Sequence, residues 1–368
     1  MSHPSYSRVM QPGSPHRASF WIRSKLVQAA NLIARRGSHF GTGRRPFPLL
    51  ESFKESLQST PGPDVLLFGD SVFERVAYQD GDRRPLGSML VDRLTELGMR
   101  PHVLTHSSYT PYMYEAFLRL AERLGAHPRC IILSFNLRCC SLQWDASPLW
   151  QFTQDHAAVE AQIIDPSAAV VPLKPVFEHP RIYDAVAFAS PLSSRRTIGE
   201  FTAIARKKPK TAANVEARKR ELLVFHYGVP IRREHRNLSS LTAAVRAAVD
   251  LRAKTLVYLT PINLPLIRRI GGPGFVDIIR ANSTLVRDAV HAGAGSSEVI
   301  WRDWLAAMPS TSFFHEQELT EHLCTEGRQR LTDLVSDTLL RQPTRSGEAA
   351  AYSSPNLDFS TDRDERPK

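Results

Sequence analysis

Two stretches of the chain, about residues 64–136 and 240–340, alternate short apolar runs with longer segments of helical periodicity. Unbroken apolar runs of four to eight residues predict buried strands, and apolar positions that recur every three or four residues predict helices. The expected strands are "DVLLFGDS", "HVLTHS", "CIILSFN", "TLVYLTPIN" and "SEVIW", and the expected helices are "LGSMLVDRLTELG", "YMYEAFLRLAERLG", "SLTAAVRAAVDLRA", "GFVDIIRANSTLVRDAVHAG" and residues 325–340. This alternation predicts crossover connections and a mostly parallel sheet between two helical layers, a three-layer α/β sandwich.

Between these stretches, residues 137–237 contain aromatic, proline-broken and basic segments without a regular alternation. A compact domain rarely holds a structureless loop of this length, so we expect a long helical insertion that forms a lid over the carboxyl edge of the sheet. The expected organisation is a basic, partly disordered N-terminal extension over residues 1–45, an α/β domain over 46–340 and a disordered tail over 341–368.

The chain has 368 residues, of which 42% are hydrophobic, and this composition is ordinary for a globular protein. No apolar run is as long as a membrane-spanning helix, and Arg23 and Lys25 interrupt the segment where a signal peptide would need an apolar region. The four cysteines form no CxxC pair, so a reducing cytoplasm is the expected location. No Gly-rich phosphate loop and no histidine metal spacing stand out, so no cofactor or metal is expected.

The net charge of +10 favours anionic partners. The excess comes from the first 45 residues and from "ARKKPKTAANVEARKRE", residues 205–221. The N-terminal part suits peripheral contact with an anionic membrane and the internal run suits an anionic substrate, although both patterns are also typical of solvated helix faces. Nucleic-acid binding is not expected, because no recognition motif accompanies the basic segments.

Chemically useful side chains follow several of the predicted strands. The first strand ends in "GDS" at Ser71, the third ends at Asn136, the fourth ends at Asn263, and His322 precedes the last predicted helix. Carboxyl ends of parallel strands meet at one edge of a sheet, where such proteins bind their ligands. A hydroxyl, an amide and an imidazole at that edge suit Ser-His catalysis, because the imidazole takes the hydroxyl proton and the amide holds the oxyanion.

The segments "LLFGDSV", "IILSFN" and "HLCTEGRQRL" resemble three sequence blocks of the SGNH (GDSL-type) hydrolases. The resemblance covers roughly residues 60–140 and 250–340 and leaves out the insertion. It implies a flavodoxin-like fold with Ser71 as nucleophile, Asn136 as oxyanion donor and His322 as general base. It also implies a small-molecule or glycan ester as substrate: water as the acceptor gives an esterase, and a sugar hydroxyl gives an O-acyltransferase.

Two positions depart from the pattern of this family. The second block reads "LTHSSYTPY", with Ser107 or Ser108 in place of an oxyanion-hole glycine, and the family's acid, three residues before the histidine, is replaced by Leu319. Glu318 is the best substitute for that acid, because it is one residue away and one methylene longer. Further candidates are Glu321, Glu316 and Asp303, and a Ser-His dyad without an acid is the remaining alternative. Loss of an orienting acid costs about four orders of magnitude in turnover elsewhere.

The same residues also have structural interpretations. Ser71 and His322 suit helix termini, Asn136 suits a turn, and Asn263 suits a turn or a pocket wall equally well. The adjacent cysteines are more typical of a buried apolar pair than of a thiol nucleophile. The aromatic residues after the third strand, which would anchor the insertion or wall a pocket, are Trp144, Trp150 and Phe152. The absent acid and glycine support an alternative function, a non-catalytic SGNH-like domain that binds a glycan or an anionic partner.

Overall fold

The computed structural model describes residues 46–141, 144, 151–174, 190–193, 197, 199–200, 203, 211–314 and 321–341. The chain divides into two compact units, residues 1–46 with 172–175 and residues 47–171 with 176–368. Of the first unit, the structure describes residue 46 and residues 172–174, and the described helices and strands belong to the second unit. The predicted basic extension over 1–45, nearly all of the predicted tail and Trp150 lie outside the described residues.

Five parallel strands form one sheet in the order β2-β1-β3-β4-β5. The strands are β1 (Val65–Gly69), β2 (Pro101–Thr105), β3 (Cys130–Phe135), β4 (Lys254–Leu259) and β5 (Val299–Asp303). Every residue of β1 and β3 is buried, and strands covered on both faces show the unbroken apolar runs from which they were predicted. The strand order changes direction between β1 and β3, and ligands of such sheets bind beyond the carboxyl ends at that point.

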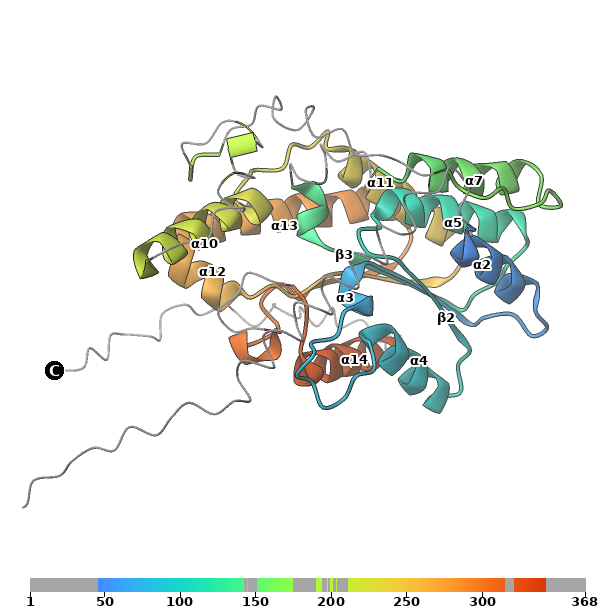
Figure 1. Cartoon of the computed structure of the whole chain (residues 1–368). Helices are drawn as coiled ribbons and strands as arrows, with labels where there is room; N and C mark the ends of the chain where they lie inside the picture. The colour runs from blue at the N-terminus through green and yellow to red at the C-terminus, as the bar shows by residue number, and fades with distance from the viewer. Residues whose placement is uncertain are drawn as a thin grey trace, which may run out of the picture. The chain divides into compact units, whose positions relative to one another are not determined.

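Helices cover both faces of this sheet (Figure 1). On one face, α11 (Arg236–Asp250) packs against α5 (Pro111–Arg123) and α13 (Pro273–Ala294), while α2 (Pro48–Gln58) lies beside β2. On the other face, α4 (Leu86–Glu96) packs against α14 (Thr325–Leu340). The remaining described helices are α3 (Ser71–Glu74), η1 (Leu137–Cys140), α7 (Thr153–Ile164), α10 (Ala212–Tyr227), α12 (Leu264–Gly271) and η3 (Ser310–Ser312). The predicted three-layer α/β sandwich with a parallel sheet is confirmed.

Side chains that alternate along the strands supply one of the two cores. Val65 and Leu67 of β1 and Ile132 of β3 are fully buried in the cluster that also contains the inner faces of α4 and α14. A period of two directs alternate residues to the same face of a sheet, so Leu66 and Phe68 of β1 face the opposite helical layer. The sheet is thus held between two apolar layers, and its carboxyl edge is where polar groups are available.

Each of the two longer described segments of the predicted insertion, residues 151–174 and 211–237, contains a helix. Helix α7 packs against α5, where Arg119 Nη1 lies 2.7 Å from Glu160 Oε1. Phe152, just before α7, packs edge-on against Tyr109 with ring centroids 4.8 Å apart, which suits the anchoring interpretation of this aromatic residue. Helix α10 contacts η1, α12 and α13. Within the described residues, no helix combines the length and hydropathy needed to cross a membrane.

Candidate active site

The Gly-Asp-Ser triplet joins β1 to α3 through a local capping arrangement. Gly69 ends β1, and Asp70 caps α3 because its Oδ1 accepts a hydrogen bond from the Val72 N–H at 2.9 Å. Ser71 is therefore the first residue of α3, at the carboxyl edge of the sheet, and it is 9% exposed. The backbone N–H of a first helical residue has no partner within the helix, so it can donate to a ligand.

His322 lies in a short segment that is held by backbone hydrogen bonds. The His322 carbonyl accepts from the Phe314 N–H at 3.0 Å, and the Cys324 N–H donates to the Ser312 carbonyl at 3.0 Å. Helix α14 begins one residue later, at Thr325. The His322 Nε2 atom lies 3.1 Å from Ser71 Oγ, so the fold brings together two residues that are 251 positions apart in the sequence.

Asn136 lies beside the predicted nucleophile through a hydrogen bond to Asp70. Its Nδ2 donates to Asp70 Oδ2 at 2.9 Å, and its Oδ1 accepts from the Arg138 N–H at 3.0 Å, which caps η1. A side-chain amide nitrogen carries two hydrogens, so this bond leaves one further donor. Asn136 therefore contacts Asp70, the residue that precedes Ser71, at the same edge of the sheet.

Burial shifts the pKa values of His322, which contacts Ser71, and of Asp70, which precedes Ser71 in the sequence. Burial lowers the pKa of His322 to about 4; Glu321 acts to raise it, and Arg75 and Arg138 lower it further. The imidazole is therefore neutral at neutral pH, the form that accepts a proton. Burial raises the pKa of Asp70 to about 6, against the lowering effect of the hydrogen bond from Val72.

The candidate acids fall in three different places. Glu318, the preferred substitute, and Glu316 lie outside the described residues. The Asp303 carboxylate accepts from Ser283 Oγ at 2.5 Å and from the Leu305 N–H at 3.1 Å, which gives it a structural role at the end of β5. Glu321 is 2% exposed, and its Oε1 lies 3.9 Å from His322 Nε2.

Sequence reasoning missed the two residues that hold Glu321. Arg138 Nη1 lies 2.8 and 3.1 Å from the two carboxylate oxygens, and the Tyr227 hydroxyl donates to Oε2 at 3.2 Å. The available signal was an arginine two residues after the strand-end asparagine. No local pattern connects either partner to a glutamate so distant in the sequence.

In the second block, where a serine stands in place of the family's oxyanion-hole glycine, the backbone has a conformation typical of glycine. Ser108 has φ of 74°, in the left-handed region that non-glycine residues seldom adopt. Its neighbour Ser107 donates from Oγ to Glu74 Oε2 at 2.7 Å. The departure from the family pattern therefore changes the side chain at this turn, while the backbone conformation is one that glycine adopts readily.

Two other candidates have structural roles. Asn263 caps α12 by accepting from the Leu266 N–H at 3.2 Å, and its Oδ1 also accepts from Ser310 Oγ at 2.8 Å. This agrees with the turn interpretation. Cys139 and Cys140 are buried, form no disulfide, and have sulfur atoms 3.9 Å apart. Neither feature adds a reactive group to the pair formed by Ser71 and His322.

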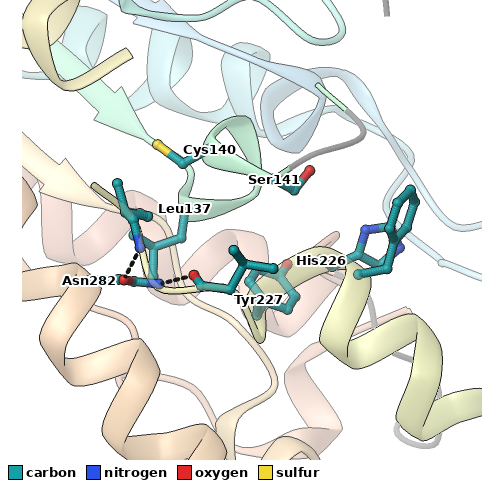
Figure 2. Close-up of a pocket in the computed structure, with 9 residues that line it drawn as sticks. Leu137, Cys140, Ser141, His226, Tyr227 and Asn282 are labelled. Atoms are coloured by element: carbon teal, nitrogen blue, oxygen red, sulfur yellow. Dashed lines mark hydrogen bonds between the residues drawn. The ribbon is translucent and has the colours of Figure 1, made fainter. Parts of the chain in front are cut away.

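A small pocket lies behind the site, between η1, the end of α10 and α13 (Figure 2). Ser141 Oγ and His226 Nδ1, both lining it, are buried and have no hydrogen-bond partner among the described residues. Its free space of about 10 Å³ suits a single water molecule and is too small for a substrate. Asn282, which also lines the pocket, accepts a hydrogen bond from the Ile231 N–H and donates one to the Val229 carbonyl.

A larger open cleft of about 400 Å³ lies beside α3, between α4 and β2. Phe73 and Val103 line its apolar part, and Glu74 and Asp92 line its acidic part. Ser71 and His322 do not line either of the two pockets described here. Two of its lining residues, Phe73 and Glu74, belong to α3, the helix that begins at Ser71.

One cluster elsewhere has the side chains of a metal site. Glu115, His156 and Glu160 bring their ligand atoms within 4.8 Å of one another. Arg119 already donates to both glutamates, at 3.4 and 2.7 Å, and Tyr112 stacks on the His156 ring at 3.9 Å. The positive charge of Arg119 explains the cluster as an ion-pair network between α5 and α7.

Comparison with known proteins gives only distant structural similarity. No family model matches the sequence, and no curated protein matches it. A mutant of Axe2, an acetyl xylan esterase from Geobacillus stearothermophilus, has a TM-score of 0.37 and 12% identity, over 77% of this chain and 98% of that one. LAE5, an alpha/beta hydrolase enzyme from the metagenome of Lake Arreo, has a TM-score of 0.35 and 10% identity, over 76% and 97%. Similarity at this level does not indicate a function for this chain.

Proposed function

We propose that this chain is an SGNH-like serine esterase or O-acyltransferase that acts on an ester-linked acyl group. The observation that carries the proposal is the 3.1 Å contact between Ser71 Oγ and His322 Nε2. Both residues are about nine-tenths buried, at the carboxyl edge of the sheet. A hydroxyl within hydrogen-bond reach of a neutral imidazole is the arrangement that activates a serine nucleophile.

The reaction proceeds in two steps that share the same residues. Ser71 Oγ attacks the ester carbonyl while His322 Nε2 takes its proton, and the alcohol leaves with that proton as the acyl-enzyme forms. Water or a sugar hydroxyl then gives its proton to His322 as it attacks the acyl-enzyme carbonyl, and the bond to Ser71 Oγ breaks as His322 returns that proton to Ser71. The second Nδ2 hydrogen of Asn136 and the Ser71 N–H stabilise the negative oxygen in both steps.

A fluorophosphonate probe tests this proposal without knowledge of the natural substrate. The probe forms a bond between phosphorus and an activated serine oxygen and releases fluoride, so labelling is read by intact mass and peptide mapping. We expect labelling at Ser71 in the wild type and none in Ser71→Ala or His322→Ala. Ser167→Ala, which removes an exposed serine whose hydroxyl donates to Asp165, serves as the matched control and should label normally.

Ester hydrolysis provides a graded test of the oxyanion donor. With a short p-nitrophenyl ester, Asn136→Ala should lower kcat about a hundred- to a thousandfold, the usual cost of one lost oxyanion donor. Circular dichroism must show a folded variant, because Asn136 also caps η1. A wild-type protein that neither reacts with the probe nor hydrolyses the ester would support the non-catalytic binding domain instead.

A further inference from the structure

A buried ion pair lies next to the proposed general base, with Glu321 Oε1 3.9 Å from His322 Nε2. Arg138 Nη1 contacts both oxygens of Glu321, and the Tyr227 hydroxyl donates a hydrogen bond to the same carboxylate. The Glu321 side chain is 2% exposed and that of Arg138 is 20% exposed. Buried ion pairs contribute little net stability compared with well-packed apolar residues, so stability alone does not account for this one.

The ion pair joins three segments that meet at the site. Arg138 follows Asn136 by two residues, and Glu321 immediately precedes His322. Tyr227 is the last residue of α10, the helix that closes the predicted insertion. One carboxylate therefore links the segment that holds the oxyanion donor, the segment that holds the base and the insertion.

Glu321 also acts on His322 through its charge. Its Oε1 lies 3.9 Å from Nε2, the nitrogen that contacts Ser71 Oγ. Although burial raises the pKa of Glu321, Arg138 and the nearby histidines hold it at about 2, so the carboxylate is ionised. The charged groups that act on His322 are this carboxylate, which favours the imidazolium, and Arg75 and Arg138, which oppose it.

We propose that Glu321 is the positioning residue for His322: held by Arg138 and Tyr227, it fixes the base opposite Ser71 and stabilises the imidazolium that forms when Ser71 gives up its proton. This inference rests on the proposed function. It assigns the supporting carboxylate to the residue directly before the histidine. That carboxylate lies near the nitrogen that accepts the proton, unlike the acid of a Ser-His-Asp triad, which bonds the other ring nitrogen.

The rate of fluorophosphonate labelling as a function of pH tests this role. Glu321→Gln should slow labelling at pH 7 by at least about tenfold, equivalent to roughly 1.4 kcal/mol of lost stabilisation. It should also move the acid limb of the rate to lower pH, because the imidazolium loses its nearest negative charge. Glu160→Gln removes a different glutamate that pairs with an arginine between helices, and it should leave rate and limb unchanged.

A double variant keeps the test independent of folding. Glu321→Gln alone leaves Arg138 buried without its partner, whereas Arg138→Met with Glu321→Gln removes both charges. The double variant should fold and still show slow labelling, with a smaller lowering of the acid limb, because Arg138→Met also removes a positive charge that opposes the imidazolium. An unchanged rate and limb in both variants, or the loss of fold in both, would overturn the inference.

The same data separate this inference from its rival and from the proposed function. If Glu318→Gln rather than Glu321→Gln slows labelling and shifts the limb, the orienting acid is Glu318. If the wild type is not labelled at Ser71, the proposed function itself fails, whatever the variants show.

Discussion

At the scale of single residues, close contacts explain why two positions in the site motifs, Gly69 and Gly327, are glycines. A Cβ on Gly69 would lie 2.2 Å from Cδ2 of the Phe73 ring, which covers the end of β1. A Cβ on Gly327, in the first turn of α14, would lie 2.2 Å from the Ser312 carbonyl oxygen. The first contact is with a side chain that can move, whereas the second is with backbone. Gly327 therefore lets α14 pack closely against Ser312, in the segment that pairs with His322.

Gly327→Ala should destabilise the chain by roughly 1–3 kcal/mol, the usual cost of overpacking a close contact. Gly81→Ala is the matched control, because no atom lies within 4 Å of its added Cβ and the residue has no positive φ. Urea denaturation of both variants measures the free energy of unfolding. Equal midpoints for the two variants would show that the approach of α14 to Ser312 relaxes without cost.

At the scale of elements, one buried arginine connects α14 to the segment between α3 and α4. Arg328 is 0% exposed, and its Nη1 lies 2.6 Å from Asp80 Oδ2 and 2.8 Å from the Leu323 carbonyl oxygen. Its Nη2 donates to the Asp82 carbonyl at 2.6 Å. His322 precedes α14 and Ser71 begins α3, so this side chain connects the surroundings of both proposed catalytic residues.

Arg328→Met should lower the free energy of unfolding by about 3–5 kcal/mol, because it takes the charged partner from the buried Asp80 carboxylate and a donor from two carbonyl groups. Arg84→Met is the control, since Arg84 pairs with Asp82 and Asp92 at an exposed position and should change the unfolding midpoint little. Chemical denaturation followed by circular dichroism measures both. A small loss for Arg328→Met would mean that water replaces the guanidinium at Asp80.

At the scale of the whole molecule, the sequence predicts the elements that are locally encoded. β1 and β3 were predicted because strands buried on both faces are unbroken apolar runs, and their ends located Ser71 and Asn136. The pairing of Arg138 with Glu321 spans 183 residues and depends on the folded arrangement of η1, so no periodicity or spacing indicates it. For the same reason the sequence did not reveal that α10 ends at the site, through Tyr227.

Two buried groups of the site affect the pH dependence of global stability in opposite directions. The pKa of His322 falls from 6.5 to about 4 on folding, so the unfolded chain binds more protons and the free energy of unfolding decreases as pH drops between these values. The pKa of Asp70 rises from 3.8 to about 6, so the folded chain binds more protons and the free energy of unfolding increases as pH drops. In the wild type the two effects partly cancel.

Single substitutions should separate the two contributions. From pH 7 to pH 5, at about 1.4 kcal/mol per pKa unit, His322 should remove about 2 kcal/mol of stability and Asp70 should add about 1 kcal/mol. The Asp70→Asn variant keeps only the loss of stability that His322 causes, and the His322→Gln variant keeps only the gain that Asp70 causes. All other titrating groups are common to both variants. Urea denaturation of each variant at the two pH values should therefore give changes that differ by about 3 kcal/mol. Equal pH dependence in the two variants would show that neither group has the pKa that its buried position implies.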